Sequence, residues 1–416
     1  MPLINKTTAR RSVIRRGHHG PGHGLRRIRT ALTAFFALDG FVFAGWVVRI
    51  PSVKEQTGAS PGALGLALLG VSAGAVVTMS LTGWLCRRYG SHPVTVVAGA
   101  LLALSVALPA HTHSALALGL VLLVFGVGFG AMNVGANSAA VDLVAALRRP
   151  VMPGFHAAFS LGGMAGAGLG GLVAGELSAA WHLGLLALAG LLIALAAGRV
   201  LLAHPAPAPD GAGQPAGAAP APASRPHRAA VYGLGFIALC TAYGEGALAD
   251  WSALHLRESL GASEGVAAAG YAVFALAMTV GRLTGTALLA RLGETRALVA
   301  GGTAGAVGML LGSLAPTVWA ALAGFVLTGL GLANVFPIAI GRAGALAGPR
   351  GVATASTVGY GGLLLGPVAI GFLAEWFTLA TALTTVALLC AVASATTLLN
   401  RGALHGAPAG RPAAHP

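Results

Sequence analysis

The sequence predicts an all-α integral membrane protein with twelve transmembrane helices in two six-helix pseudo-repeat bundles. Composition, the spacing of apolar segments and an internal repeat support this prediction. The 416-residue chain is 56% hydrophobic and only 9% charged, whereas soluble domains carry about 25% charged residues. Because a chain with so little polar surface cannot cover a globule in water, we expect the lipid bilayer to be its solvent.

Apolar segments of about 20–28 residues recur roughly every 30 residues along the chain. About 20 apolar residues are needed for one helical crossing, while outer-membrane barrels show alternation over only about ten residues. Helical spans are therefore predicted. They are 30–51, 61–85, 92–110, 114–141, 152–176, 179–203, 229–256, 264–290, 296–314, 316–341, 351–375 and 377–400.

One long connection, rich in Pro, Ala and Gly, divides the spans into six plus six. Such a composition without periodicity is typical of a linker. We therefore expect five regions: a basic cytoplasmic tail at 1–29, an N-terminal bundle at 30–203, a cytoplasmic linker at 204–228, a C-terminal bundle at 229–400 and a cytoplasmic tail at 401–416.

Basic residues indicate the orientation of the chain in the membrane. The loops opposite the tails hold little beyond Arg49, Lys54 and Arg257, and cytoplasmic loops carry the excess of Lys and Arg. Both termini are thus expected inside. The net charge of +14 lies at span ends and is not interleaved with aromatic residues in one patch, so we expect no nucleic-acid partner. The basic positions after the first tail are Arg87-Arg88, Arg148-Arg149, Arg199, Arg225, Arg228, Arg291, Arg296, Arg342, Arg350, Arg401 and Arg411.

An internal repeat relates the two halves. Matching segments recur at an offset that drifts only from 205 to 201, and a repeat of six spans indicates a duplicated transporter. The paired segments are Trp46 with Trp251, Gly58-Ala59-Ser60 with Gly261-Ala262-Ser263, Leu81-Thr82-Gly83 with Leu283-Thr284-Gly285, and Asn133-Val134 with Asn334-Val335.

The spans, repeat, linker and basic loops together resemble the major facilitator superfamily. The family's loop motif after span 2 is similar to the segment 83–92, and its second copy to 285–296, although both copies lack the motif's early acid. The resemblance implies alternating access, with substrate bound centrally by spans 1, 4, 5, 7, 8, 10 and 11. It also implies cytoplasmic gating loops that contain Gly83, Arg87, Arg88, Gly90, Arg291 and Arg296.

Segments 132–137, 149–163 and 245–252 are similar to a bacterial inner-membrane branch that includes fucose-permease relatives. This resemblance implies a multi-pass protein of the inner membrane. Sugar–proton symporters of this kind use an acid in span 1 and another in span 4. Asp39 matches the first, whereas span 4 offers Asn133 and Asn137 instead.

Three carboxylates lie inside predicted spans: Asp39 in span 1, and Glu245 and Asp250 in span 7. A charged group at mid-bilayer costs roughly 2.5–3.5 kcal/mol on insertion scales, so such residues point to a pathway. Burial favours a protonated carboxyl, as proton coupling requires. Two alternatives remain for Arg282 in span 8: it pairs permanently with a carboxylate such as Glu245 as a structural lock, or it binds a substrate anion.

Neutral polar and aromatic groups complete the predicted substrate and proton pathway. Asn133 and Asn137 share one helix face, and such amides either bind substrate or bridge helices. Trp251 either stacks on substrate or anchors the helix, and His156 acts as a proton relay or as a gate residue. The predicted pathway residues are Asp39, Glu245, Asp250, Arg282, Asn133, Asn137, His156, Asn334 and Trp251.

We therefore expect a secondary active transporter that moves a small polar solute by alternating access with proton coupling. It is expected to be a monomer and not an enzyme, with no cofactor and no metal. Two alternatives stay open: a drug or metabolite efflux pump of the same fold, and a non-transporting membrane sensor on a transporter scaffold.

Overall fold

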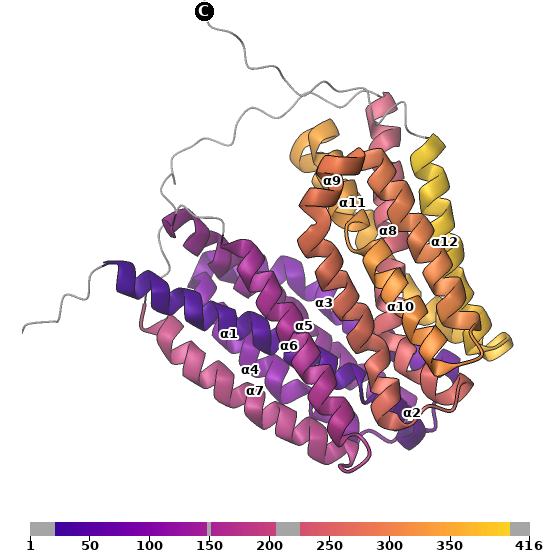
Figure 1. The fold of residues 1–416 in the computed structure, drawn as a ribbon. Helices are drawn as coiled ribbons and strands as arrows, with labels where there is room; N and C mark the ends of the chain where they lie inside the picture. Colours follow the sequence, from indigo (N-terminus) through magenta and orange to yellow (C-terminus); the bar gives the residue numbers. More distant parts are fainter. Residues whose placement is uncertain (1–20, 148–150, 205–224, 400–416) are drawn as a thin grey trace, which may run out of the picture.

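The computed structural model describes residues 21–147, 151–204 and 225–399, and these ranges contain helices and no strands (Figure 1). The first half holds α1 (Pro21–Val47), α2 (Ile50–Thr57), α3 (Pro61–Tyr89), α4 (Ser91–Ser105), the short turn η1 (Leu108–His111), α5 (Ala115–Leu147), α6 (Met152–Val173) and α7 (Ala179–Leu202). The second half holds α8 (Arg225–Leu254), the π-helical turn η2 (His255–Ser259), α9 (Glu264–Leu314), α10 (Val318–Leu332), α11 (Val335–Trp376) and α12 (Leu379–Leu399).

Eleven helical segments in the described ranges are long and apolar enough to cross a membrane. The remaining predicted span is α6, whose glycines, His156 and Ser160 lower its hydropathy. Helix α1 begins at Pro21 and α8 at Arg225, several residues before the predicted limits of 30 and 229. The predictions for residues 1–20, 205–224 and 400–416 lie outside the described residues.

Two long helices each combine segments that the sequence analysis kept separate. Helix α9 covers predicted spans 8 and 9 and turns sharply at Gly293, where φ is 73° and ψ is 165°. Predicted span 10 is α10 together with the first part of α11, with a break at Asn334 between them. The rest of α11 is predicted span 11.

The repeat extends to the backbone. The described glycines with positive φ are Gly58, Gly90, Gly261 and Gly293, and they form two pairs separated by 203 positions. Side-chain-bearing residues rarely adopt such φ values. Each half therefore uses one glycine after its first span and one after its second to reverse the chain.

Glycines also allow the same close helix contact in both halves. A Cβ at Gly162 of α6 would collide with the Ala37 carbonyl oxygen of α1, and one at Gly362 of α11 with the Leu239 carbonyl oxygen of α8. Close backbone approach through small residues is typical of helix packing in membranes. It fixes α6 beside α1, and α11 beside α8.

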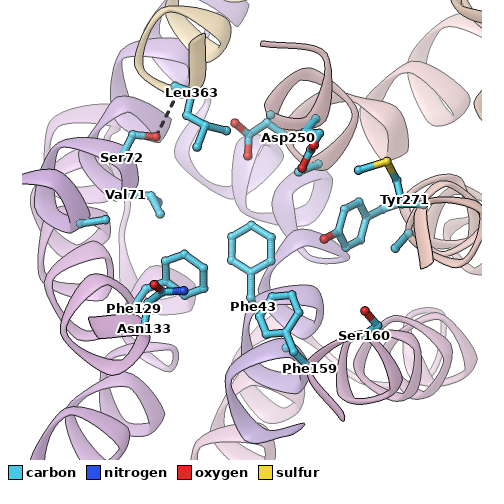
Figure 2. A pocket seen from close by; sticks show the side chains of 18 of the residues that line it. Phe43, Val71, Ser72, Phe129, Asn133, Phe159, Ser160, Asp250, Tyr271 and Leu363 are labelled. Atoms are coloured by element: carbon cyan, nitrogen blue, oxygen red, sulfur yellow. Dashed lines mark hydrogen bonds between the residues drawn. The ribbon is translucent and has the colours of Figure 1, made fainter. Parts of the chain in front are cut away.

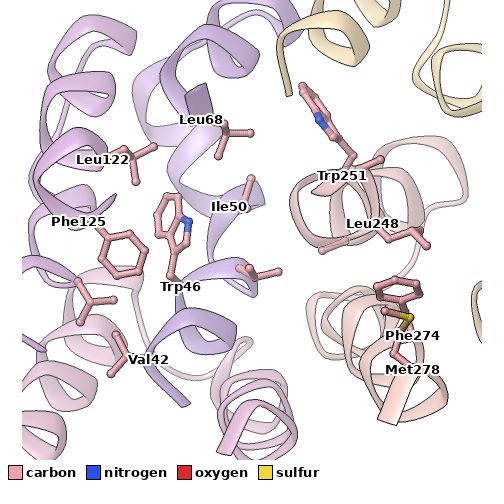
Figure 3. Packing of buried hydrophobic residues seen from close by; sticks show 14 of the residues in the cluster. Val42, Trp46, Ile50, Leu68, Leu122, Phe125, Leu248, Trp251, Phe274 and Met278 are labelled. Carbon is pink, nitrogen blue, oxygen red and sulfur yellow. The ribbon is translucent and has the colours of Figure 1, made fainter. Parts of the chain in front are cut away.

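Each half contributes one fully buried tryptophan to the apolar core. Trp46 and Trp251 are equivalent in the repeat and are 1% and 0% exposed. The Trp46 ring packs against Phe125, with centroids 6.4 Å apart, while Trp251 lies in the second half near Leu248 (Figure 3). These rings anchor the helices that line the space between the halves.

The halves contact each other mainly through α3 against α11 and α6 against α9. We call the end of the molecule that carries the Gly90 and Gly293 turns the arginine-rich end, and the opposite end the α2 end. The two groups of helices come together near α2 and diverge toward the arginine-rich end (Figure 1).

Candidate functional site

A cavity of about 320 Å³ lies between the two halves (Figure 2). Its walls come from α1, α3, α5 and α6 of the first half and from α8, α9 and α11 of the second half. The predicted lining included span 10, but the cavity residues come from α3 instead, because α3 packs directly against α11. At this contact the Ser72 hydroxyl donates to the Leu363 carbonyl oxygen at 3.1 Å.

Aromatic rings form much of the cavity wall, and sequence reasoning missed most of them. Phe43 stacks on Phe129 with centroids 5.0 Å apart, and Tyr271 meets Phe43 edge-on at 6.2 Å. Phe159 and Phe274 also line the cavity. Hydropathy cannot separate a phenylalanine that faces a cavity from one that faces lipid. Spacing could have indicated Phe43, which follows Asp39 by four residues and so shares its helix face.

Glu245 and Arg282 form an ion pair across the cavity wall, between α8 and α9. The Arg282 guanidinium nitrogen Nη2 lies 3.3 Å from each carboxylate oxygen of Glu245. Both side chains line the cavity and remain partly exposed to it, at 29% for Glu245 and 48% for Arg282. In this conformation Arg282 is paired with Glu245.

Asp250 faces the same cavity from α8 (Figure 2). It lies five positions after Glu245 on this helix, toward the α2 end. In the part of the chain that the structure describes, its carboxylate makes no hydrogen bond and no ion pair. Asp250 is thus an acidic group whose nearest surroundings include the Tyr271 ring and the apolar side chains of the cavity wall.

Asp39 lines a second cavity of about 250 Å³, which adjoins the first on the side of the arginine-rich end. The two cavities share Asn133, Ser160 and Arg282 as lining residues. Asp39 is only 3% exposed, and its Oδ1 has no hydrogen-bond partner among the described residues. Asp39 makes no ion pair with Glu245, whose carboxylate is paired with Arg282.

His156 also lines the second cavity, with its ring edge-on to Phe36 at 5.6 Å.

The predicted pathway residues separate into those that line a cavity and those that do not. Those that line a cavity are Asp39, Glu245, Asp250, Arg282, Asn133 and His156.

The other three predicted pathway residues do not line either cavity. The Asn137 amide donates to the Asn133 carbonyl oxygen of its own helix at 2.8 Å. The Asn334 amide donates to the Gly281 carbonyl oxygen at 2.8 Å, which bridges α9 to the break before α11. Trp251 is fully buried in the core of the second half.

Ion pairs close the α2 end of the cavity, and the sequence analysis did not predict them. Lys54 Nζ lies 2.5 Å from Glu258 Oε1, and Arg257 Nη2 lies 2.7 Å from Glu55 Oε1. Each pair joins the first half to the second. Arg257 also contacts Glu264 of its own half at 2.9 Å, so it links two carboxylates, one from each half.

Glu375 of α11 provides a further contact between the halves at the α2 end. Its Oε2 accepts hydrogen bonds from the Gly62 backbone N–H at 3.0 Å and from the Ser60 hydroxyl at 3.2 Å. These donors lie at the start of α3, where the helix dipole favours a negative charge. The second half therefore caps a helix of the first.

Arg49 supports this closed end from within the first half. Its guanidinium donates to His182 Nδ1 at 2.8 Å and to the carbonyl oxygens of Ala174 and Leu177 at 3.1 and 2.9 Å. Burial lowers the pKa of Arg49, and the charge of Glu264 opposes that shift. The end of α1 is thereby tied to the α6–α7 connection.

The predicted gating loops lie at the arginine-rich end. Arg87, Arg88, Arg291 and Arg296 are exposed there, Gly83 lies in the last turns of α3, and Gly90 ends that helix. Sequence reasoning missed a repeated contact beside the turns.

The residue after each turn glycine contacts a polar side chain near the end of a neighbouring span. The Ser91 hydroxyl donates to Asp142 Oδ2 at 2.9 Å, and at the equivalent place Arg342 Nε lies 3.7 Å from Glu294 Oε2. Each turn is therefore in contact with the fourth span of its own half. In the first half this span is α5, and in the second half it is α10 together with the start of α11.

Comparison with known proteins agrees with this architecture. The sequence model of the Major Facilitator Superfamily matches residues 30–244 and 234–415. An uncharacterised MFS-type transporter of Yersinia pestis is 36% identical over 375 residues, covering 88% of this chain and 93% of that protein. The membrane protein MosC of Rhizobium meliloti is 30% identical over 384 residues, covering 86% and 90%.

Solved structures share the fold at low sequence identity. A bacterial homologue of the human lysosomal transporter Spinster, in an inward-facing and unoccupied conformation, matches with a TM-score of 0.75 and 17% identity, over 94% of this chain and all of that one. A D-xylose–proton symporter matches with a TM-score of 0.70 and 13% identity, over 89% and 97%. The chain therefore belongs to the major facilitator superfamily, and it is a multi-pass membrane transporter and not an enzyme.

Proposed function

We propose that this protein is a proton-coupled secondary transporter that moves a small polar solute by alternating access. The observation that carries the proposal is the central cavity, which both halves line and which cross-half ion pairs close at the α2 end. A site that each half supplies in part can be exposed to either side in turn when the halves rotate against each other.

The excess of Arg at the arginine-rich end supports a cytoplasmic location for that end. We propose that the protein is a monomer in a bacterial inner membrane, with both termini and the 204–228 linker inside. In this orientation the structure corresponds to a state that is closed to the outside. Opening outward requires separation of Lys54 from Glu258 and of Arg257 from Glu55.

The coupling proton is proposed to use Asp39 and Glu245. Protonation of Glu245 would remove the negative charge that holds Arg282, and Arg282 also borders the second cavity, in which Asp39 lies. Asp39 has an oxygen without a partner among the described residues, so it can accept a proton without breaking an existing bond. His156 borders the same cavity on the side of the arginine-rich end and is a candidate relay.

Transport assays in proteoliposomes test this proposal. A thermal-shift screen of sugars, amino acids and organic amines first selects a solute, and its uptake is then measured with and without an imposed pH gradient. Asp39→Asn and Glu245→Gln are expected to abolish accumulation against a concentration gradient. Glu176→Gln, an exposed carboxylate outside both cavities, is the matched control.

The outcomes separate the parts of the proposal. Asp39→Asn is expected to retain exchange of solute between equal pools, because exchange needs no net proton movement. Gradient-driven accumulation that is unchanged in both variants would exclude proton coupling through these residues. If the wild-type protein neither accumulates nor exchanges any solute that it binds, transport itself is contradicted. The polarity of the productive gradient distinguishes import from efflux.

A further inference from the structure

We propose that the central cavity selects a small organic ammonium ion, with the positive charge held by Asp250 and the aromatic wall. The inference rests on the proposed function and names the substrate class of the same site. It is argued from the charges that face the cavity, the rings beside Asp250 and the size of the space.

The charges that face the cavity are not balanced. Glu245 and Arg282 neutralise each other through contacts of 3.3 Å. Asp250 faces the same space, and its carboxylate makes no ion pair and no hydrogen bond with the described residues. A carboxylate without a counter-ion inside a membrane-spanning segment is costly. A cationic ligand would remove that cost, whereas an anionic ligand would increase it.

The rings near Asp250 suit a cation equally well. Tyr271 lies beside Asp250, and Phe43 and Phe129 continue the wall (Figure 2). Tyr271 and Phe43 meet edge-on at 6.2 Å, and Phe43 stacks on Phe129 at 5.0 Å, so the three rings form one connected part of the wall. Aromatic faces attract ammonium groups, by about 0.5–2 kcal/mol per contact.

Size and polarity restrict the rest of the ligand. A space of about 320 Å³ is at the small end of the range for ligand pockets, roughly 300–1,000 Å³. On the side away from Asp250 the neutral polar groups Asn133 and Ser160 line the cavity. The ligand that fits is thus an amine with one ring or a short chain, and with a neutral polar or apolar opposite end.

Binding to the purified full-length protein tests the inference independently of transport. The probes are two sets of matched molecules that differ in charge: phenethylamine, 2-phenylethanol and phenylacetate, and glucosamine, glucose and glucuronate. At neutral pH, calorimetry is expected to give at least one amine an affinity about tenfold above those of its neutral and anionic counterparts, which corresponds to about 1.4 kcal/mol.

Variants assign the preference to Asp250. Asp250→Asn is expected to lower amine affinity about tenfold and to leave neutral counterparts nearly unchanged, while Asp250→Glu keeps the preference for amines. Glu176→Gln, on the exposed α6–α7 connection, is the control and is expected to bind all probes as the wild type does. The melting temperature without ligand shows whether Asp250→Asn is folded. If Asp250→Asn does not fold, the preference of Asp250→Glu for amines still tests whether a negative charge at this position selects the ligand.

Three results would overturn the inference: no binding of either amine, neutral or anionic probes that bind as tightly as amines, or amine binding that Asp250→Asn leaves intact. The last result would be expected if Asp250 served only as a protonated group. Amine binding without transport would contradict the proposed function and leave this inference standing. Transport of neutral or anionic solutes in preference to amines would support the proposed function and contradict this inference.

Discussion

Arg49 shows how one residue supports the closed end of the molecule. The residue is 1% exposed, and its side chain donates to His182 and to the carbonyl oxygens of the α6–α7 connection. Arg49→Leu would leave these acceptors unpaired, so we expect a loss of about 2–4 kcal/mol in unfolding free energy. Arg49→Lys keeps the charge, but an ammonium has three donors and no planar fork. The unfolding free energy of Arg49→Lys should lie between those of Arg49→Leu and the wild type.

Thermal unfolding in detergent, followed by fluorescence, measures both Arg49 variants against the wild type. A melting temperature for Arg49→Leu equal to that of the wild-type protein would contradict the structural role assigned to this side chain.

All four charged residues of the predicted pathway line a cavity, whereas Asn137, Asn334 and Trp251 do not. Asp39, Glu245, Asp250 and Arg282 were recognisable because a charge in an apolar span needs a partner or water. Asn137 does not line either cavity in this conformation, and its amide donates to the Asn133 carbonyl oxygen of its own helix. The aromatic wall was missed since hydropathy carries no information about which way a ring faces.

At the scale of elements, the two turns at the arginine-rich end depend on glycine. Gly90 has φ 92° and ψ 151°, and Gly293 has φ 73° and ψ 165°. Residues with a Cβ are strained in this region by about 1–3 kcal/mol. We expect Gly90→Ala and Gly293→Ala each to lower the melting temperature. Gly184→Ala, at a helical position in α7 with open space around it, is the control and should be neutral or slightly stabilising.

Parallel melting curves of the three variants test this prediction, and equal melting temperatures for Gly90→Ala and Gly184→Ala would contradict it. The sequence indicated these turns through the repeated Gly motif. It did not indicate that the helices before and after Gly293 follow each other with no loop between them. Hydropathy carries no information about the backbone angles of a glycine.

At the scale of the whole molecule, the sequence predicted two six-span halves but not which end of the cavity is closed. Apolar periodicity and the repeat depend on neighbouring residues and on a constant offset, both of which can be read along the chain. Closure depends on pairs such as Lys54 with Glu258, whose members are separated by about 200 positions. The residues around Lys54 do not indicate that Glu258 is its partner, and the residues around Glu258 do not indicate Lys54.

Arg257 is the best single position at which to test that closure. It contacts Glu55 across the interface and Glu264 within its own half. Exposed ion pairs are each worth only about 0–1 kcal/mol, so Arg257→Ala should shift a balance between conformations and not unfold the protein. We expect the α2 end to open in a larger fraction of molecules, and rising salt to weaken the closed state of the wild type as well.

Spin labels at His113 and Pro316 report the separation of the halves at the α2 end, since both positions are exposed there and belong to different halves. The labels require replacement of Cys86, Cys240 and Cys390. Arg257→Ala should add a longer distance to the distribution, whereas the control Arg29→Ala, an exposed position on α1, should not. Identical distributions for Arg257→Ala and the wild type would mean that helix packing, through α3 with α11 and α6 with α9, holds the end closed without the ion pairs.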